Sequence, residues 1–377
     1  MSAPPAAPTQ RFFLDPLVDG PLTGPRVLQL VPDASGPSLW RAWQPTRFLQ
    51  FRGYPVDWVC PSDPQFTQVP VLAYDLIVLC RLSWQPAHRG RGRRFLAALR
   101  RAGKRVLYEC DDDLFTRFSF DQQARRTDRE ASLSDLALAG ETDRWALTQV
   151  DGVTCSTQYL ASTVRRFTDV PVEVVPNAID ADWFTSVQQG VPRPVAGPTV
   201  GWAGGGRPGD DLEPMAVAWG RIARARPDVT FLVAGNQPPI LTEHVPEERL
   251  YRLPWLPPEQ YPAGMVGMDV GCCPLADRAF NRCKTPIKAW EFGLSGSAVV
   301  ASPTVYGACI EDGRNGWLAE TADEWEAAIR RLLEDDDQRR RVAGRLEQDV
   351  RTKWSLAQHY WRWPLAWSRL MGGPGGD

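Results

Sequence analysis

Short apolar runs alternate with longer amphipathic stretches along the chain from Arg26 onward. This alternation is typical of a parallel sheet whose two faces are covered by helices. Apolar residues recur at helical spacing in residues 93–102 and 131–150, which predicts a helix in each segment. In the first half of the chain, the runs that predict strands are residues 26–31, 55–59, 74–80, 105–110, 152–155 and 172–175.

The same pattern begins again at Thr199. It follows residues 188–198, which are rich in Pro, Gly and Val and have no amphipathic period. A second α/β unit is therefore predicted, with a helix over residues 212–225. Its predicted strands are residues 199–205, 230–235, 269–274 and 298–302.

We expect two domains, with a boundary near residues 185–198, and a C-terminal extension. After Asp336 the pattern is helical to about Leu370, with a kink expected at Pro364. The many Trp and Tyr residues in this extension predict that it docks on the rest of the protein. The predicted units are a flexible Pro-rich tail (1–25), an N-terminal Rossmann-like domain (26–187), a C-terminal Rossmann-like domain (198–354) and a helix that packs back toward the N-terminal domain (355–377).

Composition narrows the class of protein. A chain of 377 residues exceeds what one hydrophobic core usually organises. Hydrophobic residues make up 43% and charged residues 23%, with 45 acidic against 43 basic side chains. These values exclude collagen-like, mostly disordered and polybasic proteins. No apolar run approaches the roughly 20 residues that span a bilayer, so we expect no transmembrane helix. Residues 1–25 lack the features of a secretory signal, so we expect no signal peptide there.

Cysteine and histidine usage points to a protein without disulfides or zinc. The eight cysteines are scattered without a CxxC pair, and most lie in apolar, strand-like runs. Reduced, buried thiols in a cytoplasmic protein are therefore predicted. The three histidines lie far apart, and none stands beside a cysteine or carboxylate at ligand spacing, which argues against a zinc site. Acid–base chemistry is then expected from carboxylates.

A glycine-rich loop, which includes Gly204, Gly205 and Arg207, ends the predicted strand at 199–205. Such a turn lets backbone N–H groups approach phosphate oxygens, and the guanidinium adds a fixed positive charge. The alternative is a tight strand-to-helix turn that binds nothing. The loop does not match GxxxxGK[ST], which disfavours a nucleoside-triphosphatase P-loop.

Lys284, Lys288 and Glu291 are spaced i, i+4 and i+7, which predicts that all three share one face of a helix. Two ammonium groups and a carboxylate beside a turn suit a nucleoside diphosphate. The lysines would contact phosphate oxygens, and the carboxylate would accept from ribose hydroxyls. The alternative is a solvated stripe of salt bridges.

Three carboxylates, Asp111, Asp112 and Asp113, directly follow the predicted strand at 105–110. The carboxyl ends of parallel strands border the crevice in which doubly wound folds bind ligands. Asp111 or Asp112 is therefore a candidate to accept or orient the proton of an acceptor hydroxyl. The alternatives are N-capping of a following helix and a DxD-type metal site.

Residues 89–105 are strongly basic, since eight of these seventeen side chains are Arg or Lys. An ordinary solvated helix face is the favoured interpretation, because the overall charge is slightly negative. Peripheral contact with anionic lipid, or with a polyanionic acceptor, is the alternative.

The segment KTPIKAWEFGLSGSAVVAS (284–302) resembles the donor-site helix and following strand of B-fold glycosyltransferases, in particular family 4 of the group 1 enzymes. PNAID (176–180), VGWAGG (200–205) and residues 313–341 also match, in the same order and spacing. The resemblance covers most of residues 170–355. It is looser over residues 26–120.

The resemblance implies an α/β protein with two Rossmann-like doubly wound domains that face a central cleft, the glycosyltransferase B-type fold. It also implies a role for each matched residue. Glu291 would hold the donor ribose, Gly204, Gly205 and Arg207 would border the diphosphate, and Lys284 and Lys288 would neutralise the leaving group.

Three further expectations depend on the resemblance. Gly36, in a predicted loop after the first strand, would face the donor phosphates across the cleft, with a plain surface turn as the alternative. Cys283 stands where the family often has a glutamate, and a neutral thiol cannot replace that carboxylate. No metal site is expected, because B-fold enzymes generally dispense with a chelating DxD.

We therefore predict a glycosyltransferase that moves a sugar from a nucleotide-diphosphate donor to an acceptor hydroxyl. The acceptor would be a glycan, a lipid-linked sugar or another hydroxyl compound. The nucleotide sugar is a co-substrate, and no cofactor is predicted; retention of configuration is implied by the resemblance alone. The alternatives are a non-catalytic nucleotide-sugar-binding protein, motivated by Cys283, and a transferase for modified nucleic acid, motivated by residues 89–105 and the 16 Trp residues.

Overall fold

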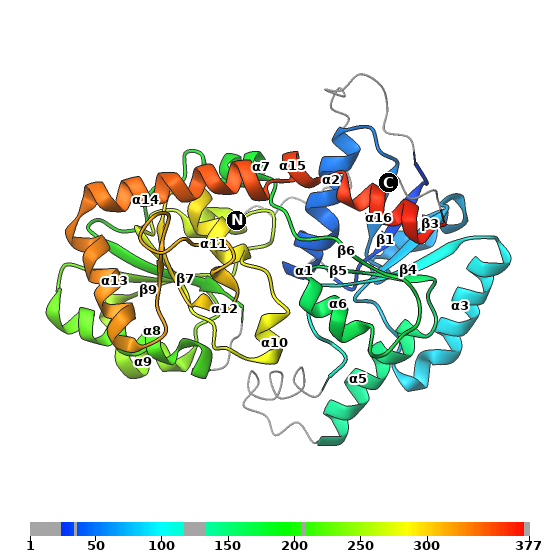
Figure 1. Ribbon diagram of the computed structural model, residues 1–377, viewed down its shortest axis with the longest axis horizontal. Coiled ribbons are helices and arrows are strands. Elements are labelled where there is room, and N and C mark those ends of the chain that lie inside the picture. The colour runs from blue at the N-terminus through cyan, green and yellow to red at the C-terminus, as the bar shows by residue number, and fades with distance from the viewer. Residues whose placement is uncertain (1–23, 34–35, 117–132, 206–208, 373–377) are drawn as a thin grey trace.

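The computed structural model describes residues 24–33, 36–116, 133–205 and 209–372. Within these residues the chain forms two six-stranded parallel sheets, each covered by helices (Figure 1). The predicted α/β class with two doubly wound domains is confirmed. The predicted tail at 1–25 lies almost wholly outside the described residues, which begin at Gly24.

The first sheet has the strand order β2-β1-β3-β4-β5-β6, and every neighbouring pair is parallel. Strands β1, β3 and β5 are buried at every residue. Continuous apolar runs are expected where helices cover both faces of a parallel sheet. The bounds are β1 (Val27–Leu30), β2 (Val56–Val59), β3 (Leu76–Cys80), β4 (Arg105–Cys110), β5 (Gly152–Cys155) and β6 (Val172–Val174).

The second sheet has the order β12-β11-β10-β7-β8-β9 and is also parallel throughout. The apolar runs predicted neither β9 nor β12, although the resemblance over residues 313–341 implied a closing strand, which matches β12. Both are short edge strands that lack a continuous apolar run. The bounds are β7 (Thr199–Gly204), β8 (Thr230–Gly235), β9 (Leu250–Leu253), β10 (Val270–Cys273), β11 (Ala298–Ala301) and β12 (Trp317–Leu318).

The predicted helices at 93–102, 131–150 and 212–225 correspond to α3, α5 and α8. Before the second sheet the helices are α1 (Gly36–Ser38), the π-helical turn η1 (Leu39–Trp43), α2 (Gln44–Phe51), α3 (Arg89–Arg101), α5 (Leu133–Leu147), α6 (Gln158–Val164) and α7 (Ala181–Gln188). Around the second sheet they are α8 (Gly209–Ala225), α9 (Pro239–His244), α10 (Ala279–Arg282), α11 (Ile287–Leu294), α12 (Pro303–Tyr306), α13 (Ala322–Glu334) and α14 (Asp336–Asp349). The C-terminal segment holds η7 (Val350–Trp354), α15 (Leu356–His359) and α16 (Arg362–Leu370).

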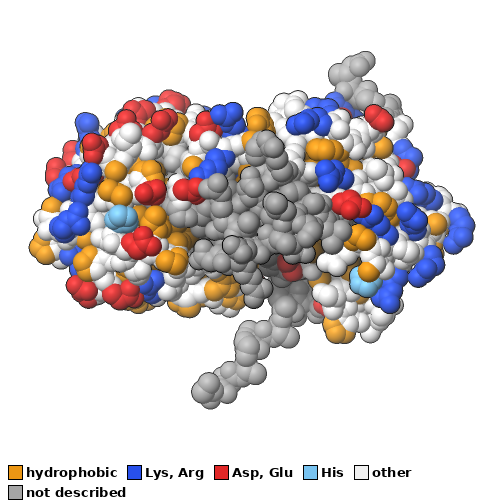
Figure 2. All heavy atoms as spheres, turned by 90° about the horizontal axis from the view of Figure 1, so that it is seen from below, with side chains coloured by type: hydrophobic (Ala, Val, Ile, Leu, Met, Phe, Trp, Pro, Cys, Tyr) orange, Lys and Arg blue, Asp and Glu red, His pale blue; other side chains and the backbone are white. Residues whose placement is uncertain are grey.

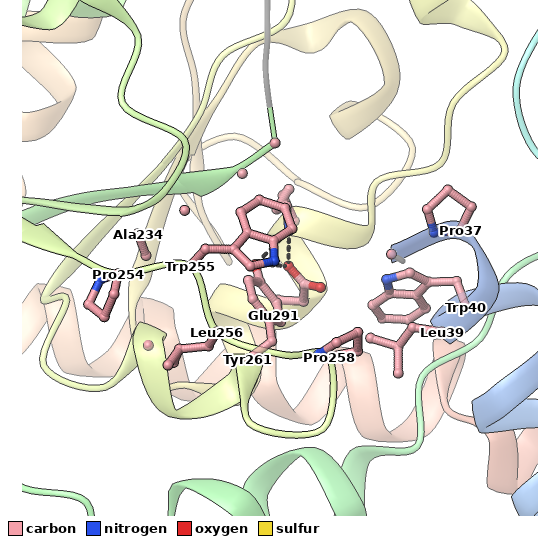
Figure 3. Close-up of a pocket in the computed structure, with 16 residues that line it drawn as sticks. Pro37, Leu39, Trp40, Ala234, Pro254, Trp255, Leu256, Pro258, Tyr261 and Glu291 are labelled. Carbon is pink, nitrogen blue, oxygen red and sulfur yellow. Dashed lines mark hydrogen bonds and ion pairs between the residues drawn. The ribbon is translucent and has the colours of Figure 1, made fainter. Parts of the chain in front are cut away.

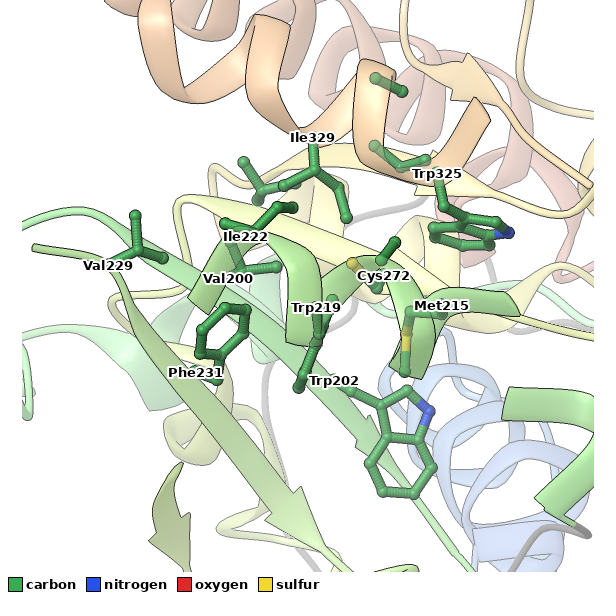
Figure 4. Close-up of a cluster of buried hydrophobic side chains, with 14 of the residues drawn as sticks. Val200, Trp202, Met215, Trp219, Ile222, Val229, Phe231, Cys272, Trp325 and Ile329 are labelled. Carbon is green, nitrogen blue, oxygen red and sulfur yellow. The ribbon is translucent and has the colours of Figure 1, made fainter. Parts of the chain in front are cut away.

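A large apolar cluster fills the space between the second sheet and helices α8 and α13 (Figure 4). Trp219 of α8 packs on Phe231 of β8 with ring centroids 5.0 Å apart, and Trp325 of α13 is buried beside them. Helices α7, α11 and α14 contribute to the cluster on the opposite face. Because both faces are tightly packed, the carboxyl ends of these strands form a rigid edge on which loops can hold a ligand.

The chain crosses between the domains twice, and the two crossings are hydrogen-bonded to each other. The Ile179 N–H donates to the Trp354 carbonyl at 3.0 Å, and the Leu356 N–H donates to the Ile179 carbonyl at 2.8 Å. After the second crossing, α15 and α16 lie over the first domain (Figure 1). Trp363 and Trp367 of α16 are buried with Tyr54 and Val56 of that domain.

The predicted domain boundary near residues 185–198 is wrong, because the first crossing comes before α7. Trp183 and Phe184 of α7 are buried in the apolar cluster of the second domain. The Pro- and Gly-rich segment that suggested a linker is a loop of the second domain, where Arg193 binds Asp269 at 2.8 Å. Composition thus identified a real loop, but the burial of two aromatic residues decides the domain to which α7 belongs.

The C-terminal helical stretch is interrupted at Tyr360 and Trp361, between α15 and α16 and one turn before Pro364, which is where the predicted proline kink falls. It also breaks earlier, at Ser355, where the backbone is extended and the chain crosses between the domains. Pro364 is the third residue of α16. In the first turn of a helix, proline removes no intrahelical hydrogen bond, because those N–H groups have no intrahelical partner.

The prediction of buried thiols is confirmed for all the cysteines except Cys60, and all eight are free cysteines in the structure. In the part of the chain that the structure describes, no helix combines the length and apolar character needed to cross a bilayer.

We predict that Trp367→Ala will destabilise the protein by about 3 kcal/mol or more, because the side chain is 1% exposed and its removal leaves a cavity between α16 and the first sheet. Trp361→Ala is the matched control. Trp361 is 48% exposed, and its loss should cost less than about 1 kcal/mol. Urea unfolding of both variants measures the difference, and equal midpoints would contradict the docking of α16.

Candidate functional site

A cavity of about 290 Å³ opens between the two domains at the carboxyl ends of their strands (Figure 3). The first domain contributes Gly36, Pro37, Leu39 and Trp40 to its lining. A second cavity of about 200 Å³ shares Gly36, Pro37, Trp40 and Lys288 with the first and extends to Asp111 and Asp112. The two cavities therefore form one continuous cleft. The second domain's share of the larger cavity is Gly204, Gly205, Ala234, Gly235, Pro254, Trp255, Leu256, Pro258, Tyr261, Gly264, Lys288 and Glu291.

Gly36 lies at both cavities, but it is not in a loop as predicted. It is the first residue of α1, which continues through η1 into α2, so that a helical stretch from Gly36 to Phe51 begins at the cleft. The first N–H groups of a helix have no intrahelical partner and carry partial positive charge. The first domain thus presents a weakly electropositive helix start to the cleft.

Gly204 and Gly205, at the end of β7, line the larger cavity, as the predicted glycine loop requires. Beside them, Gly235 has a φ of +98°, and a Cβ atom there would lie 2.5 Å from the Gly204 carbonyl oxygen. Only glycine allows β7 and β8 to end so closely, which leaves their backbone open to a ligand. The predicted phosphate contact Arg207 lies outside the described residues.

Lys288 and Glu291 lie on α11 as predicted, and they form an ion pair of 2.6 Å. Tyr261 donates to the same carboxylate oxygen, Glu291 Oε2, at 2.9 Å. Burial and the adjacent carboxylate raise the pKa of Tyr261 well above its ordinary value, so the hydroxyl stays protonated. The other oxygen, Glu291 Oε1, is buried without a hydrogen-bond partner among the described residues.

The larger cavity combines this buried carboxylate with an apolar wall. Glu291, Tyr261 and Trp255 all line this cavity (Figure 3). Trp255 is 62% exposed, which is unusual for so large an apolar side chain. A buried acceptor oxygen without a donor is costly unless a ligand supplies one. The cavity therefore fits a molecule that has hydroxyl donors and a flat apolar group.

The prediction that Lys284 shares a helix face with Lys288 and Glu291 is wrong. Helix α10 ends at Arg282 and α11 begins at Ile287, so Lys284 lies in the segment between them. Pro286 accounts for the break, because the residue before a proline is disfavoured in the helical region. Lys284 instead reaches across the cleft, where its Nζ atom lies 2.6 Å from Asp112 Oδ1.

The three carboxylates after β4 have different surroundings. Asp113 accepts the backbone N–H groups of Phe115 and Thr116 at 3.0 and 3.1 Å, which is a local side-chain-to-backbone turn, and the segment that would hold a capped helix lies outside the described residues. Asp111 and Asp112 line the smaller cavity instead. Arg81, which sequence analysis missed, lies 3.2 Å from Asp111 Oδ1 and 3.6 Å from Asp112 Oδ2. Its position directly after β3, the neighbour of β4, was the signal that could have identified it.

Sequence analysis also missed a buried polar network behind the cleft. Arg41, 1% exposed, donates to Glu109 Oε1 at 2.7 Å and to Asn177 Oδ1 at 2.8 Å. The amide of Asn177 in turn donates to Thr285 Oγ1 at 2.8 Å. Thr285 is the neighbour of Lys284, so this network connects the helix that begins at Gly36 with the lysine segment of the other domain.

Cys283, which stands where the resemblance leads one to expect a glutamate, lines neither cavity. Its side chain is fully buried in the apolar cluster of the first domain. Burial raises the pKa of this thiol well above its ordinary value, so it remains neutral. No group of three or more His, Cys, Asp or Glu side chains in the described ranges is arranged to hold a metal ion.

Comparison with known proteins identifies the second domain. A sequence model of the family "Glycosyl transferases group 1" matches residues 197–335, from the start of β7 to the end of α13. Residues 197–335 are a group 1 glycosyltransferase domain. The resemblance predicted from the motifs is confirmed at this level, whereas the narrower assignment to family 4 stays a prediction.

One relative of this chain is TuaH of Bacillus subtilis (strain 168), which carries the provisional name of a teichuronic acid biosynthesis glycosyltransferase. It is 29% identical over 167 residues. The alignment spans 41% of this chain and 41% of TuaH, so the similarity covers less than half of either protein.

Solved structures match nearly the whole chain. Sucrose-phosphate synthase from Thermosynechococcus elongatus has a TM-score of 0.63 at 15% identity, and the match covers 92% of this chain and 99% of that one. HepE from Anabaena, solved in complex with UDP and glucose, has a TM-score of 0.58 at 16% identity and coverages of 91% and 99%. At these identities the likeness concerns the fold, and the predicted glycosyltransferase B-type fold is confirmed.

Proposed function

We propose that the protein transfers a sugar from a nucleotide-diphosphate donor to an acceptor hydroxyl. The observation that carries this proposal is the buried Glu291 Oε1 atom, which lacks a hydrogen-bond donor and lies at an interdomain cavity lined by a group 1 glycosyltransferase domain. A ribose hydroxyl would supply the missing donor. The exposed ring of Trp255 and the apolar residues around it would then cover the base.

The donor diphosphate would lie between the two domains. Gly204, Gly205 and Lys288 line one side of the larger cavity, and Gly36 lines the other. Backbone N–H groups and a helix start at these positions suit phosphate oxygens. Arg207, from the same glycine-rich loop, would add a contact to the diphosphate. Because HepE was solved with UDP, uracil is the first base to test.

Cations near the diphosphate would drive the chemical step. As the glycosidic bond breaks, positive charge grows on the sugar ring and negative charge grows on the departing diphosphate. Lys284 and Lys288 lie together at the smaller cavity and would stabilise that negative charge. A preorganised contact of this kind contributes roughly 3 kcal/mol in a site from which water is excluded.

Asp111 and Asp112 are the proposed acceptor-side residues, because both line the smaller cavity next to the lysines. One of them would accept or orient the proton of the attacking hydroxyl. Both carboxylates already pair with Arg81, and Asp112 also pairs with Lys284. This pairing supports a mechanism in which lysines, rather than a metal ion bound to these aspartates, neutralise the diphosphate.

The acceptor is proposed to be a glycan or lipid-linked sugar, in line with the name of TuaH. Retention of configuration is proposed by analogy alone.

The basic segment supports a further proposal on location. Figure 2 shows Lys and Arg side chains gathered at the end of the molecule formed by the first domain. On α3, the exposed side chains of Arg91, Arg93, Arg94 and Arg101 have no ion pair with any described residue. Leu96 and Leu99 of the same helix are buried, so α3 cannot insert its apolar face into a bilayer. We propose a cytoplasmic protein that contacts anionic lipid peripherally, through charge.

We predict that one nucleoside diphosphate among UDP, GDP, ADP and TDP binds the protein selectively, with equal affinity in Mg²⁺ and in EDTA. Glu291→Gln should weaken that binding roughly tenfold or more, because hydrogen bonds to charged groups contribute about 1.5–3 kcal/mol. Glu243→Gln, the same change at an exposed residue of α9, is the control and should have no effect. Calorimetric titration measures the affinities. Equal affinity of Glu291→Gln and wild type would contradict the assigned ribose contact.

We predict that Lys284→Ala lowers the turnover number about 100-fold, through loss of charge stabilisation in the transition state. Lys104→Ala, which removes a lysine paired with Asp75 at the far end of the first sheet, should leave turnover unchanged. Product formation from the donor identified above is the measurement. Donor binding without turnover in the wild type would instead favour the non-catalytic alternative.

We predict that the protein sediments with vesicles that contain phosphatidylglycerol but not with neutral phosphatidylcholine vesicles, since each arginine near an anionic surface contributes about 1 kcal/mol. The triple change Arg91→Glu, Arg93→Glu, Arg94→Glu should abolish sedimentation. The control is Arg340→Glu, Arg341→Glu, Arg345→Glu on α14, a triple change of the same charge at exposed positions. Binding of single-stranded RNA without binding of vesicles would favour the nucleic-acid alternative.

A further inference from the structure

Arg81 has a backbone conformation that arginine rarely adopts. It directly follows β3 and has a φ of +50°, and among the described non-glycine residues it alone has a positive φ. This region is disfavoured for any residue with a Cβ atom. The conformation is held by the Arg81 N–H group, which donates to the Glu109 carbonyl at 2.8 Å and so extends the pairing of β3 with β4 beyond Cys80. Strain that surrounding structure maintains is found preferentially at functional sites.

In this conformation the Arg81 side chain lies beside two carboxylates. One guanidinium nitrogen, Nη1, lies 3.2 Å from Asp111 Oδ1 and 3.6 Å from Asp112 Oδ2. Burial alone would lower the pKa of Arg81, but the two aspartates more than offset this effect and raise it. Two adjacent carboxylates repel each other when both are ionised. A single cation between them holds both in place.

Asp112 is contacted by a cation from each domain, Arg81 from the first and Lys284 from the second. In the proposed reaction Lys284 neutralises the diphosphate, so its contact with Asp112 competes with the donor. When Lys284 turns to the phosphates, Arg81 remains as the described cation beside Asp111 and Asp112. Arg81 lines neither cavity. It therefore acts on the reaction through these carboxylates.

We propose that Arg81 is the positioning residue of the acceptor side of the site, which holds the carboxylates of Asp111 and Asp112 toward the acceptor hydroxyl while Lys284 serves the donor. This role rests on the proposed function. It separates two tasks by domain: the second domain provides the cation for the leaving group, and the first provides the cation that orders the carboxylates.

The backbone of Arg81 offers a clean test, because glycine adopts a φ of +50° without strain. Arg81→Gly should keep the turn after β3 and remove the whole side chain, including the guanidinium. We expect the full-length variant to bind the donor diphosphate within about twofold of wild type in calorimetry and to lose about 100-fold in the turnover number at saturating donor. Addition of guanidinium chloride at non-denaturing concentration should restore part of the turnover, and the same concentration of sodium chloride should not.

Two further variants complete the experiment. Arg81→Lys keeps the charge but lacks the planar fork, so its turnover should lie between those of wild type and Arg81→Gly. Arg105→Ala, at the other end of β4, removes an arginine paired with Asp151 and should keep wild-type turnover. A purely structural role of Arg81 would lower donor affinity and turnover together, without rescue by guanidinium, and that result would overturn the proposal. Wild-type turnover in Arg81→Gly would do the same. Absence of turnover in the wild-type protein would overturn the proposed function itself.

Discussion

The buried guanidinium of Arg41 is the interaction on which the arrangement of the cleft depends. It donates to Glu109 of β4, to the Val175 carbonyl and to Asn177 at the first crossing between the domains. Breaking a buried ion pair leaves an uncompensated charge, so these partners are fixed relative to one another. The helical stretch that starts at Gly36, the strand β4 that ends just before Asp111 and the crossing that precedes α7 are therefore held as one unit. Asn177 extends this unit to Thr285 of the second domain.

The sequence predicted the sheets well, because each buried strand of a parallel sheet is a continuous apolar run. All ten strands expected from such runs are present within two residues at either end. The predictions that failed concern segments whose structure is not determined by the local hydrophobic pattern. Strands β9 and β12 lie at a sheet edge and are short. The position of α7 depends on which domain's core buries Trp183 and Phe184. The residues that bury them are far away in the sequence, so the local pattern does not identify them.

The candidate site was predicted less completely, for a physical reason. Spacing along a helix correctly placed Lys288 beside Glu291, because that contact is local. The contacts of Lys284 with Asp112, and of Arg81 with both aspartates, join residues far apart in sequence or on different strands. Charge alone does not reveal such partners. Arg81 was nevertheless within reach of sequence reasoning, since the rule that selects the carboxyl end of β4 applies equally to β3.

The charges at the cleft explain why its two sides need separate cations. Arg81, Lys284 and Lys288 carry three positive charges, and Asp111, Asp112 and Glu291 carry three negative charges, so the described ionic groups balance. A diphosphate that enters between these paired groups adds negative charge and competes with the carboxylates for the lysines. Interactions that strengthen as charge develops on the leaving group favour the transition state over the ground state. A lysine shared between Asp112 and the diphosphate fits that requirement, provided that another cation keeps the released carboxylate in place. Arg81 occupies that position, and the strained backbone that puts it there is consistent with a functional rather than a structural origin.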